Sequence, residues 1–417
     1  MKETLEWLNA RIGLNHRTGL DRVKKAAQLL GRPDRAYPII HVTGTNGKGS
    51  TVAFLKQLLV NQGLKVGTFT SPHMVTICDR VSINGCPISD ADFVRLAAAI
   101  AQMEEDLKKD HDSLSYFEIL TLLALLYFKE EAVDVCLLEV GIGGLLDATN
   151  LVEGDLSLIT SIGLDHQDTL GGSLEEIALQ KAGIFKSGRP ALIGPLPEEA
   201  VHVTKEKARA LGCPFYAYGQ DFRMLAGHHF LSHGAHLSEL HLGLPGDFQA
   251  ENAALALEAF YLFMQEQGRP VKEEAVKAAL AETRWAGRLE RMGEGIILDG
   301  AHNLPAMERL VAYIKTLKGE RISLLFGALG RKDYQPMLAY LEEELPEASL
   351  YVTSFAYDGA IGKEDVQGFP SVEFVENYQE FVENFKTPVD KSDLLFVTGS
   401  LYFIAEVRAY LLGQMEK

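Results

Sequence analysis

The sequence contains little cysteine and little positive charge, and each shortage excludes a class of protein. Its 417 residues include only 4 cysteines, and no two of them form a Cys-x-x-Cys pair. We therefore expect neither a disulfide framework nor a structural zinc site, and we predict a reduced cytoplasmic protein. The formal net charge of −17 argues against a nucleic-acid-binding or anionic-membrane-binding surface, because both require an excess of lysine and arginine.

Long apolar segments are lacking as well. The first residues, MKETLEWLNARIG, do not combine a basic start with an apolar core, so no secretion signal is expected. The longest strongly apolar stretch, residues 119–128, is about half the length that crosses a bilayer. We interpret it as a buried helix and expect no membrane partner.

Alternating strands and helices dominate the rest of the chain, and they predict an α/β fold. Apolar, β-branched runs expected as strands lie at residues 39–42, 66–70, 133–138, 156–161 and 191–194. Helical spacing separates most of them, at residues 51–62, 90–109, 117–130 and 174–185. This alternation is typical of a mostly parallel sheet covered on both faces. Short period-two segments over residues 213–244 predict a small antiparallel region appended to that sheet.

A second α/β series begins near residue 291. Its strands are predicted at residues 295–298, 323–326, 349–352 and 394–397, and its helices at 305–317, 334–344 and 401–412. A chain of 417 residues is too long for one typical core. We therefore predict an N-terminal P-loop-type domain over residues 1–290 and a smaller Rossmann-like domain over residues 291–417.

The stretch HVTGTNGKGST, residues 41–51, lies between a predicted strand and a predicted helix, as a phosphate-binding loop does. Its spacing departs from the common pattern of Gly, four residues, then Gly-Lys-Ser/Thr. Val42 stands where that pattern has its first glycine, and Gly49 stands where it has a hydroxyl residue. The alternative interpretation is a glycine-rich turn that holds no ligand.

The loop nevertheless carries the groups that phosphate binding needs. Glycines at positions 44, 47 and 49 allow the backbone to approach phosphate oxygens, and the helix N-terminus supplies free N–H groups. Lys48 adds a positive charge for the β and γ phosphates, and Ser50 or Thr51 offers a hydroxyl to a metal or phosphate. We predict a nucleotide site, and the sequence leaves open which hydroxyl touches the metal.

Two further polar clusters follow predicted strands of the same sheet. Glu139 ends a buried strand on the side of a parallel sheet where ligands bind, so we predict that it is a magnesium ligand. Pairing with a lysine or arginine is the alternative. His166, beside Asp165 and Asp168, is a candidate metal ligand or base. Lys181, on the helix that follows, would on sequence alone be a solvated surface lysine.

The second domain repeats the arrangement of strand, polar cluster and helix. Asp299, His302 and Asn303 would face a ligand at the edge of its sheet. Ser400 begins the last helix, either as a carboxylate site or as a plain N-cap. A separate group of histidines does not converge on one point of its predicted hairpin, so we expect no metal there. These are histidines 228, 229, 233, 236 and 241.

Taken together and in this order, several segments resemble the folylpolyglutamate synthase/dihydrofolate synthase family, within the Mur-type amide ligases. The resemblance covers nearly the whole chain, and DATN with the preceding leucine is more similar to the bacterial bifunctional members. The segments are HVTGTNGKGS (41–50), FTSPH (69–73), YFE (116–118), LEVGIGG (138–144), DATN (147–150), the stretch from LDH to LG (164–171), KAGIFK (181–186), Asn252 after Gln249, GRLE (287–290), DGAHN (299–303) and TGSLYF (398–403).

The resemblance implies an ATP- and Mg²⁺-dependent ligase with the nucleotide between two domains, and it implies roles for particular residues. ATP contacts fall on Gly44, Thr45, Asn46, Gly47, Lys48, Gly49, Ser50, Thr51, Asn252, Arg288 and Asp299. Metal ligands fall on Ser71, Glu139 and His166, pteroate or folate contacts on Phe117, Asp147 and Asn150, and glutamate contacts on His302 and Ser400. Lys181 matches a carbamylated lysine, and with Lys48, Glu139, His166 and His302 it completes the expected catalytic set. A monovalent cation is a further cofactor that the resemblance allows.

The implied reaction adds L-glutamate to dihydropteroate, to folate or to both, through an acyl phosphate and with release of ADP and phosphate. The expected partners are these small molecules, without nucleic acid or membrane, and we expect a monomer. One alternative is a Mur-type ligase acting on a cell-wall precursor, for whose extra N-terminal domain we see no room before the phosphate loop. The other is a non-catalytic P-loop protein, which would have no use for the clusters of the second domain.

The chain departs from the family pattern at a few positions without losing an expected catalytic group. Leu145 stands where bacterial relatives often carry arginine, a difference that bears on the preference for pterin substrates. Gln180 replaces a glutamate, Leu304 replaces a proline, and residues 247–248 replace a histidine-containing segment.

Overall fold

The chain folds into two compact units, which we describe from a computed structural model in residues 1–14, 18–330, 333–386, 390 and 392–413. Unit 1 comprises Met1–Ser71, Ile77–Gly243 and Gln249–Thr283. Unit 2 comprises Pro72–Thr76, Leu244–Phe248 and the chain from Arg284 onward. The predicted domain boundary between residues 290 and 291 lies within the first strand of unit 2.

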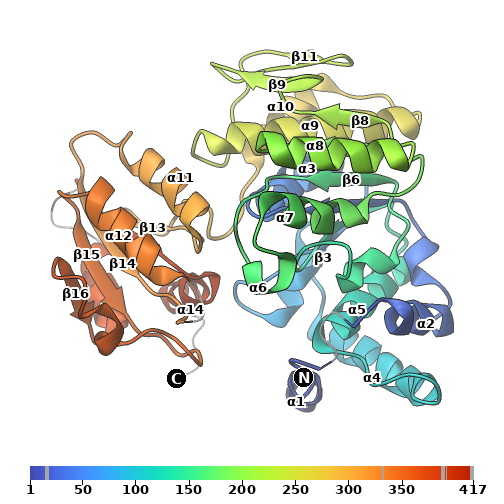
Figure 1. Cartoon of the computed structure of the whole chain (residues 1–417), viewed down its shortest axis with the longest axis horizontal. Coiled ribbons are helices and arrows are strands. Elements are labelled where there is room, and N and C mark those ends of the chain that lie inside the picture. The colour runs from blue at the N-terminus through green and yellow to red at the C-terminus, as the bar shows by residue number, and fades with distance from the viewer. Residues whose placement is uncertain (15–17, 331–332, 387–389, 391, 414–417) are drawn as a thin grey trace. The chain divides into compact units, whose positions relative to one another are not determined.

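Unit 1 is built on an 8-stranded sheet in the order β4-β3-β2-β5-β1-β6-β7-β8. Figure 1 labels β3, β6 and β8 of this sheet and several of the helices that pack around it. Its strands are β1 (Ile39–Thr43), β2 (Val66–Phe69), β3 (Val81–Ile83), β4 (Cys86–Pro87), β5 (Val135–Glu139), β6 (Leu156–Ile159), β7 (Ala191–Ile193) and β8 (Phe215–Ala217). Neighbouring strands run parallel except where β3 pairs with β2 and with β4. The predicted, mostly parallel sheet is therefore confirmed, and β1 lies near its middle between β5 and β6.

Helices cover both faces of this sheet because its central strands are apolar in both directions. One core cluster joins α1, α2, α4 and α5 to β1, β2 and β5, and another joins α7 and α8 to β6 and β7. On the other face, α3 contacts β1, β2 and β5 and packs against α10. The helices are α1 (Lys2–Asn9), α2 (Asp21–Leu29), α3 (Lys48–Asn61), α4 (Asp90–Leu107), α5 (Tyr116–Glu130), α6 (Gln167–Leu170), α7 (Leu174–Lys181), α8 (Glu198–Ala210), α9 (Phe248–Glu266) and α10 (Glu273–Glu282), with 3₁₀ turns η1 (Pro33–Arg35), η2 (Ile77–Arg80), η3 (Ala148–Leu151) and η4 (Ala182–Ile184).

The longest apolar stretch of the sequence forms most of α5. Its residues 119–125 are all buried, which confirms the prediction of a buried helix. Ser115 and Glu118 form a capping box that begins this helix. Across the described part of the chain, no helix is long and apolar enough to span a bilayer.

A small antiparallel sheet follows the main one, as predicted, with β10 (His229–Ser232) paired to β9 (Phe222–Leu225) and β11 (His236–Leu237). The change of pattern comes later than expected, because β8 still pairs in parallel with β7. A strand of 3 residues is too short to reveal its periodicity in the sequence.

Unit 2 is a doubly wound α/β layer with the strand order β12-β13-β17-β14-β15-β16. Ile297 of β13 packs in a core with α11 and α12, whereas its neighbours Ile296 and Leu298 pack in another core with α13 and α14. Alternation along a strand thus places helices on both faces, as predicted. The strands are β12 (Glu290–Arg291), β13 (Ile296–Leu298), β14 (Arg321–Phe326), β15 (Ser349–Thr353), β16 (Val372–Val375) and β17 (Asp393–Thr398), and the helices are α11 (Leu304–Ile314), α12 (Tyr334–Glu344), α13 (Tyr378–Lys386) and α14 (Leu401–Leu411), with η5 (Lys363–Val366).

Candidate active site

The glycine-rich loop connects β1 to α3 at the carboxyl end of the unit 1 sheet, where ligands of such sheets bind. Gly44 and Gly47 have positive φ angles of +157° and +86°. A Cβ at Gly44 would lie 1.8 Å from Thr160 Oγ1, and a Cβ at Gly47 would lie 2.4 Å from Asn252 Oδ1. Packing against the protein's own side chains therefore requires glycine at these two positions, in addition to any need for close approach to a phosphate.

The end of β6 fixes the shape of this loop. The Thr45 amide donates to the Ser161 carbonyl at 2.9 Å, and the Asn46 amide donates to Ser161 Oγ at 2.9 Å. The Asn46 carbonyl accepts hydrogen bonds from the hydroxyls of Thr160 at 2.6 Å and Ser161 at 2.9 Å. Sequence reasoning did not select these two hydroxyl residues, because the predicted strand at residues 156–161 included both, whereas the observed strand ends at Ile159.

Lys48 is the first residue of α3, and its side chain folds back onto the loop. Its Nζ donates to the carbonyls of Gly44 at 2.8 Å and Thr45 at 3.2 Å. The positive charge thus lies beside the first N–H groups of the helix, which together favour an anion.

Three hydrogen-bonded side chains connect α3, the loop helix that follows the phosphate loop, to α9. Gln249 is fully buried, and its Nε2 donates to Ser50 Oγ at 3.3 Å. Its Oε1 accepts from Asn252 Nδ2 at 2.9 Å, which turns the Asn252 oxygen toward Gly47. Thr51 differs from Ser50, because its hydroxyl is buried without a partner among the described residues.

Glu139 and Ser71 meet at the same sheet edge. Glu139 ends β5 and is 3% exposed, and its Oε2 accepts from the Ser71 amide at 3.3 Å. This contact places Ser71 next to the carboxylate, and carboxylate and hydroxyl oxygens suit a hard cation such as Mg²⁺, which takes its remaining ligands from phosphate and water. This donor set therefore fits the predicted metal.

His166 lies in a more open position. It precedes α6 with a left-handed φ of 52°, its side chain is 37% exposed, and its Nε2 lies 3.9 Å from Asp165 Oδ1. Within the described ranges, no group of three or more His, Cys, Asp or Glu residues could hold a metal ion. The structure thus joins Ser71 to Glu139 and does not add His166 to a cluster of that kind.

Phe117 and Asp147 converge on Gly141, in the loop after β5. A Cβ at Gly141 would lie 2.8 Å from Phe117 Cζ and 3.1 Å from Asp147 Oδ2. The Phe117 ring also packs against the Phe69 ring, with centroids 5.6 Å apart. Two of the three residues expected to contact the pteroate or folate are thus brought together.

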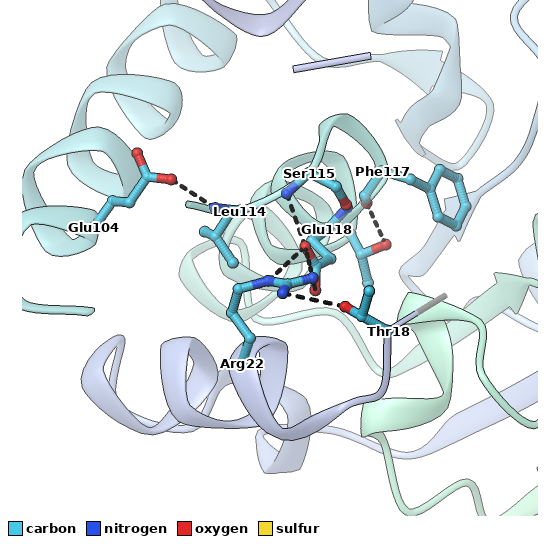
Figure 2. A network of polar contacts seen from close by, with 8 residues as sticks. Thr18, Arg22, Glu104, Leu114, Ser115, Phe117 and Glu118 are labelled. Atoms are coloured by element: carbon cyan, nitrogen blue, oxygen red, sulfur yellow. Dashed lines mark hydrogen bonds and ion pairs between the residues drawn. The ribbon is translucent and has the colours of Figure 1, made fainter. Parts of the chain in front are cut away.

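A buried ion pair holds the start of α5, and with it Phe117 (Figure 2). Arg22 of α2 donates to both carboxylate oxygens of Glu118, with its Nη2 at 2.9 and 3.0 Å and its Nε at 3.1 Å. Glu118 also accepts from the Ser115 amide at 2.7 Å. The helix that presents the aromatic ring is therefore anchored on its neighbour.

Asn150, the third residue expected to contact the pteroate or folate, connects its own loop to the segment around Gly183 by hydrogen bonds. Its Nδ2 donates to the carbonyls of Leu145 at 3.1 Å and Gly183 at 3.0 Å, and its Oδ1 accepts from Lys186 Nζ at 2.9 Å. Both amide hydrogens contact the protein, so its side chain acts on the shape of the loop.

Lys181 corrects an expectation drawn from the residues alone. It ends α7 and is 3% exposed, so it is not a solvated surface lysine. The sequence around it shows only a short amphipathic helix. The backbone of Lys181 packs closely against Gly144, where a Cβ would lie 2.9 Å from the Lys181 carbonyl.

In unit 2, the loops after β13 and β17 form one cluster. The Ala301 carbonyl accepts from the Gly399 amide at 3.0 Å and from the Thr398 hydroxyl at 3.3 Å. His302 Nδ1 lies 2.7 Å from the Gly300 carbonyl, and because a carbonyl only accepts, that nitrogen carries the hydrogen. Ser400 caps α14 by accepting from the Tyr402 amide at 3.2 Å.

Asp299 lies at the base of this cluster. Its two oxygens accept from the amides of Leu289 at 3.1 Å and Ala301 at 3.0 Å. Burial raises the pKa of its carboxyl, while Arg288 and these two amides act in the opposite direction. Asp299 and Arg288, both expected to contact the nucleotide, are thus neighbours within unit 2.

Comparison with known proteins agrees with this division. Residues 42–260 match the Mur ligase middle domain, and residues 287–401 match the glutamate ligase domain of Mur ligases. The chain is 35% identical to the dihydrofolate synthase/folylpolyglutamate synthase of Bacillus subtilis over 98% of its own length and 99% of that protein. It is 31% identical to the folylpolyglutamate synthase of Lacticaseibacillus casei over 94% of each chain.

Solved structures show the same similarity. A complex of folylpolyglutamate synthase (FPGS) with AMPPCP and folate has a TM-score of 0.86 and 31% identity, covering 99% of each chain. Escherichia coli FolC in complex with DHPP and ADP has a TM-score of 0.87 and 31% identity, covering 99% of this chain and 98% of that one.

Proposed function

Because this chain belongs to the folylpolyglutamate synthase/dihydrofolate synthase family, we propose that it joins L-glutamate to dihydropteroate, to a folate or to both at the expense of ATP. The observation that carries this proposal is the phosphate loop with Lys48, held at the same sheet edge as Ser71 and Glu139. The chain binds ATP at this loop, in keeping with the AMPPCP and ADP complexes of its structural relatives.

The reaction needs ATP because an unactivated carboxylate does not react with an amine. The carboxylate oxygen attacks the γ-phosphorus, ADP leaves, and an acyl phosphate forms. Lys48 and the N-terminus of α3 stabilise the negative charge on the transferring phosphoryl group. Glu139 and Ser71, and by our assignment His166, would hold a Mg²⁺ ion, which would supply further neutralisation of the phosphate charge.

The second half of the reaction forms the amide. The glutamate amine attacks the acyl carbon, inorganic phosphate leaves, and the amine gives up its proton. We assign glutamate binding to His302 and to Ser400, which stands at the N-terminus of α14. With its hydrogen on Nδ1, a neutral His302 offers Nε2 as the acceptor for that proton.

On the acceptor side, we assign Phe117 and Asp147 to direct contact and Asn150 to the shape of the loop.

Dependence of ADP release on its substrates tests the whole assignment. ADP should appear only when ATP, L-glutamate and either dihydropteroate or tetrahydrofolate are all present. Release without glutamate would favour a P-loop switch protein that has no ligase activity, and release with a UDP-muramyl substrate would favour a cell-wall ligase. The ratio of turnover on the two acceptors decides between dihydrofolate synthase, folylpolyglutamate synthase and both.

We assign a carbamate to Lys181, because burial of an ammonium is costly and the modified side chain is anionic and able to bind a metal. Protein equilibrated with ¹³C-bicarbonate should show a carbamate carbonyl resonance that disappears in Lys181→Arg. Lys186→Arg, at a neighbouring half-buried lysine, serves as the control and should keep the resonance. A signal that persists in Lys181→Arg would refute the assignment.

The remaining assignments concern the setting of the enzyme. Four free cysteines suit a reducing compartment, and we place the protein in the cytoplasm. We expect a monomer whose partners are its small-molecule substrates, and a stimulation by K⁺ would identify the monovalent cation as a further cofactor. Light scattering and activity in K⁺-free buffer check these two expectations.

A further inference from the structure

His41 lies in the middle of β1, two residues before the end of the strand that leads into the phosphate loop. Its side chain is completely buried, and its Nε2 lies 2.9 Å from Thr149 Oγ1. Thr149 belongs to η3, in the DATN segment that also carries Asp147. The histidine of the nucleotide-loop segment thus reaches toward the acceptor loop.

The direction of the hydrogen bonds follows from their partners. The Thr149 hydroxyl donates its only hydrogen to Asp147 Oδ1, at 2.6 Å. It must therefore accept from His41, so Nε2 of the ring carries a hydrogen. His41 Nδ1 has no partner among the described residues, and burial, followed by the charge of Lys186, lowers the pKa of the imidazole to about 3. The ring is thus a neutral, permanent donor.

Asp147 is oriented by this donor and by the backbone. Its Oδ1 also accepts from the Thr149 amide at 3.0 Å, and its Oδ2 accepts from the Ile142 amide at 3.0 Å. The same Oδ2 faces Gly141 beside the Phe117 ring. We call the hydrogen bonds that run from His41 through Thr149 to Asp147 the relay. Rotation of the Asp147 carboxylate would break these contacts, so the relay determines which edge of Asp147 lies next to Phe117.

A second contact from β1 supports the same loop. The Thr43 hydroxyl donates to the Gly143 carbonyl at 2.5 Å. Thr43 and His41 point to the same side of the strand, because residues two apart share a face. One strand therefore carries the phosphate loop at its end and positions the acceptor loop with two side chains.

We propose that His41 and Thr149 are positioning residues for the pteroate or folate acceptor, although His41 is part of the nucleotide-loop segment. Their task is to hold Asp147 in the rotamer that meets the acceptor. This inference rests on the proposed function, since it takes Asp147 as part of the acceptor site. It separates the segment HVTGTNGKGST into two parts, with His41 serving the acceptor and Gly44 to Thr51 serving ATP.

Matched substitutions test this division. Gln reaches about as far as Nε2 of histidine and also carries an N–H donor, whereas Asn is shorter and ends near the position of Nδ1. His41→Gln should keep the KM for the acceptor within about threefold of the wild type, and His41→Asn should raise it tenfold or more. Thr149→Ser should behave as the wild type, and Thr149→Val should match His41→Asn.

Nucleotide binding provides the internal control. The KM for ATP and the Kd of AMPPCP from calorimetry should stay within twofold of the wild type in all four variants. The double variant with His41→Asn and Thr149→Val should raise the acceptor KM no more than either substitution alone. An equal rise in the Kd of AMPPCP, or an acceptor KM unchanged in both His41→Asn and Thr149→Val, would overturn the proposal.

Two further readings keep the test decisive. If Thr149→Val does not fold, the comparison of His41→Gln with His41→Asn carries the result, since both side chains are polar and similar in size. If the wild type itself shows no acceptor-dependent ADP release, the proposed function fails, which is distinct from failure of the relay.

Discussion

The side-chain oxygen of Asn252 lies so close to Gly47 that a Cβ there would be 2.4 Å away. Asn252 comes from α9, about two hundred residues further along the chain, and Gln249 sets its orientation. The phosphate loop is thus shaped by packing with a distant helix as well as by its own glycines.

Gly47→Ala should weaken ATP binding. The new methyl group collides with Asn252 Oδ1, and alanine at a φ of +86° costs about 1–2 kcal/mol. Calorimetry with AMPPCP should show a Kd raised about tenfold or more. Gly63→Ala is the control, because Gly63 has a φ of +89° with nothing within 4 Å of its Cβ position. It should lose stability and keep its ATP affinity; equal losses of affinity in both would contradict the packing explanation.

Gln249→Leu should raise the KM for ATP and destabilise unit 1. The substitution leaves Ser50 and Asn252 without their buried partner, at a cost of about 1–3 kcal/mol per group. Denaturant unfolding and ATP kinetics measure the two effects. Gln57→Leu removes another Gln–Asn bond, to Asn61 on the same loop helix, and should change neither KM nor stability by much. If both variants behaved alike, Gln249 would have no special role at the loop.

Arg22→Met should destabilise unit 1 by about 3–5 kcal/mol, because it leaves the Glu118 carboxylate buried and unpaired by its cation (Figure 2). The exposed pair of Arg95 and Glu130 is the control, with side chains 52% and 45% exposed. Arg95→Met should cost about 1 kcal/mol or less. A cost for Arg22→Met as small as the control, measured by urea unfolding, would show that the buried pair is replaceable.

The buried His41 predicts a loss of stability in acid. Burial lowers its folded pKa from 6.5 to about 3, so the unfolded chain binds the proton more tightly. The stability that the neutral imidazole contributes to the folded state is complete above pH 6.5. It declines as the pH falls toward 3, and the loss is about 3 kcal/mol at pH 4. His41→Gln lacks a titrating group, so the difference in unfolding free energy between wild type and variant should shift by that amount. A difference that is constant from pH 7 to 4 would mean that the imidazole is not held neutral.

Glu139→Ala should abolish turnover and leave the fold intact. Loss of the metal carboxylate removes several kcal/mol of transition-state stabilisation, so kcat should fall by about 100- to 1,000-fold or more. Glu153→Ala, at an exposed glutamate of the same unit, is the control. Near-wild-type activity in Glu139→Ala, with circular dichroism unchanged, would refute the magnesium role.

Local pattern was enough to predict much of this protein. Apolar runs and helical spacing predicted the mostly parallel sheet, the buried helix α5 and the second α/β layer. The phosphate loop was visible because its chemistry is contiguous in sequence. The short strands β12 and β16 escaped prediction, and β8 was assigned to the antiparallel region, since two to four residues carry too little periodicity. The helix α13 was missed although its apolar residues recur at helical spacing.

Long-range packing determined the rest of the site. The residues next to Lys181 in the sequence do not indicate that it is buried. Those next to His41 do not indicate that its ring is connected to Asp147 through Thr149. These relations join segments from different strands and loops, whose register depends on the whole sheet. Residue types and spacings therefore defined which chemistry the chain carries. The folded sheet decided which side chains are buried, which way their hydrogen bonds run and which of them meet, because burial and hydrogen-bond direction are properties of neighbours in space.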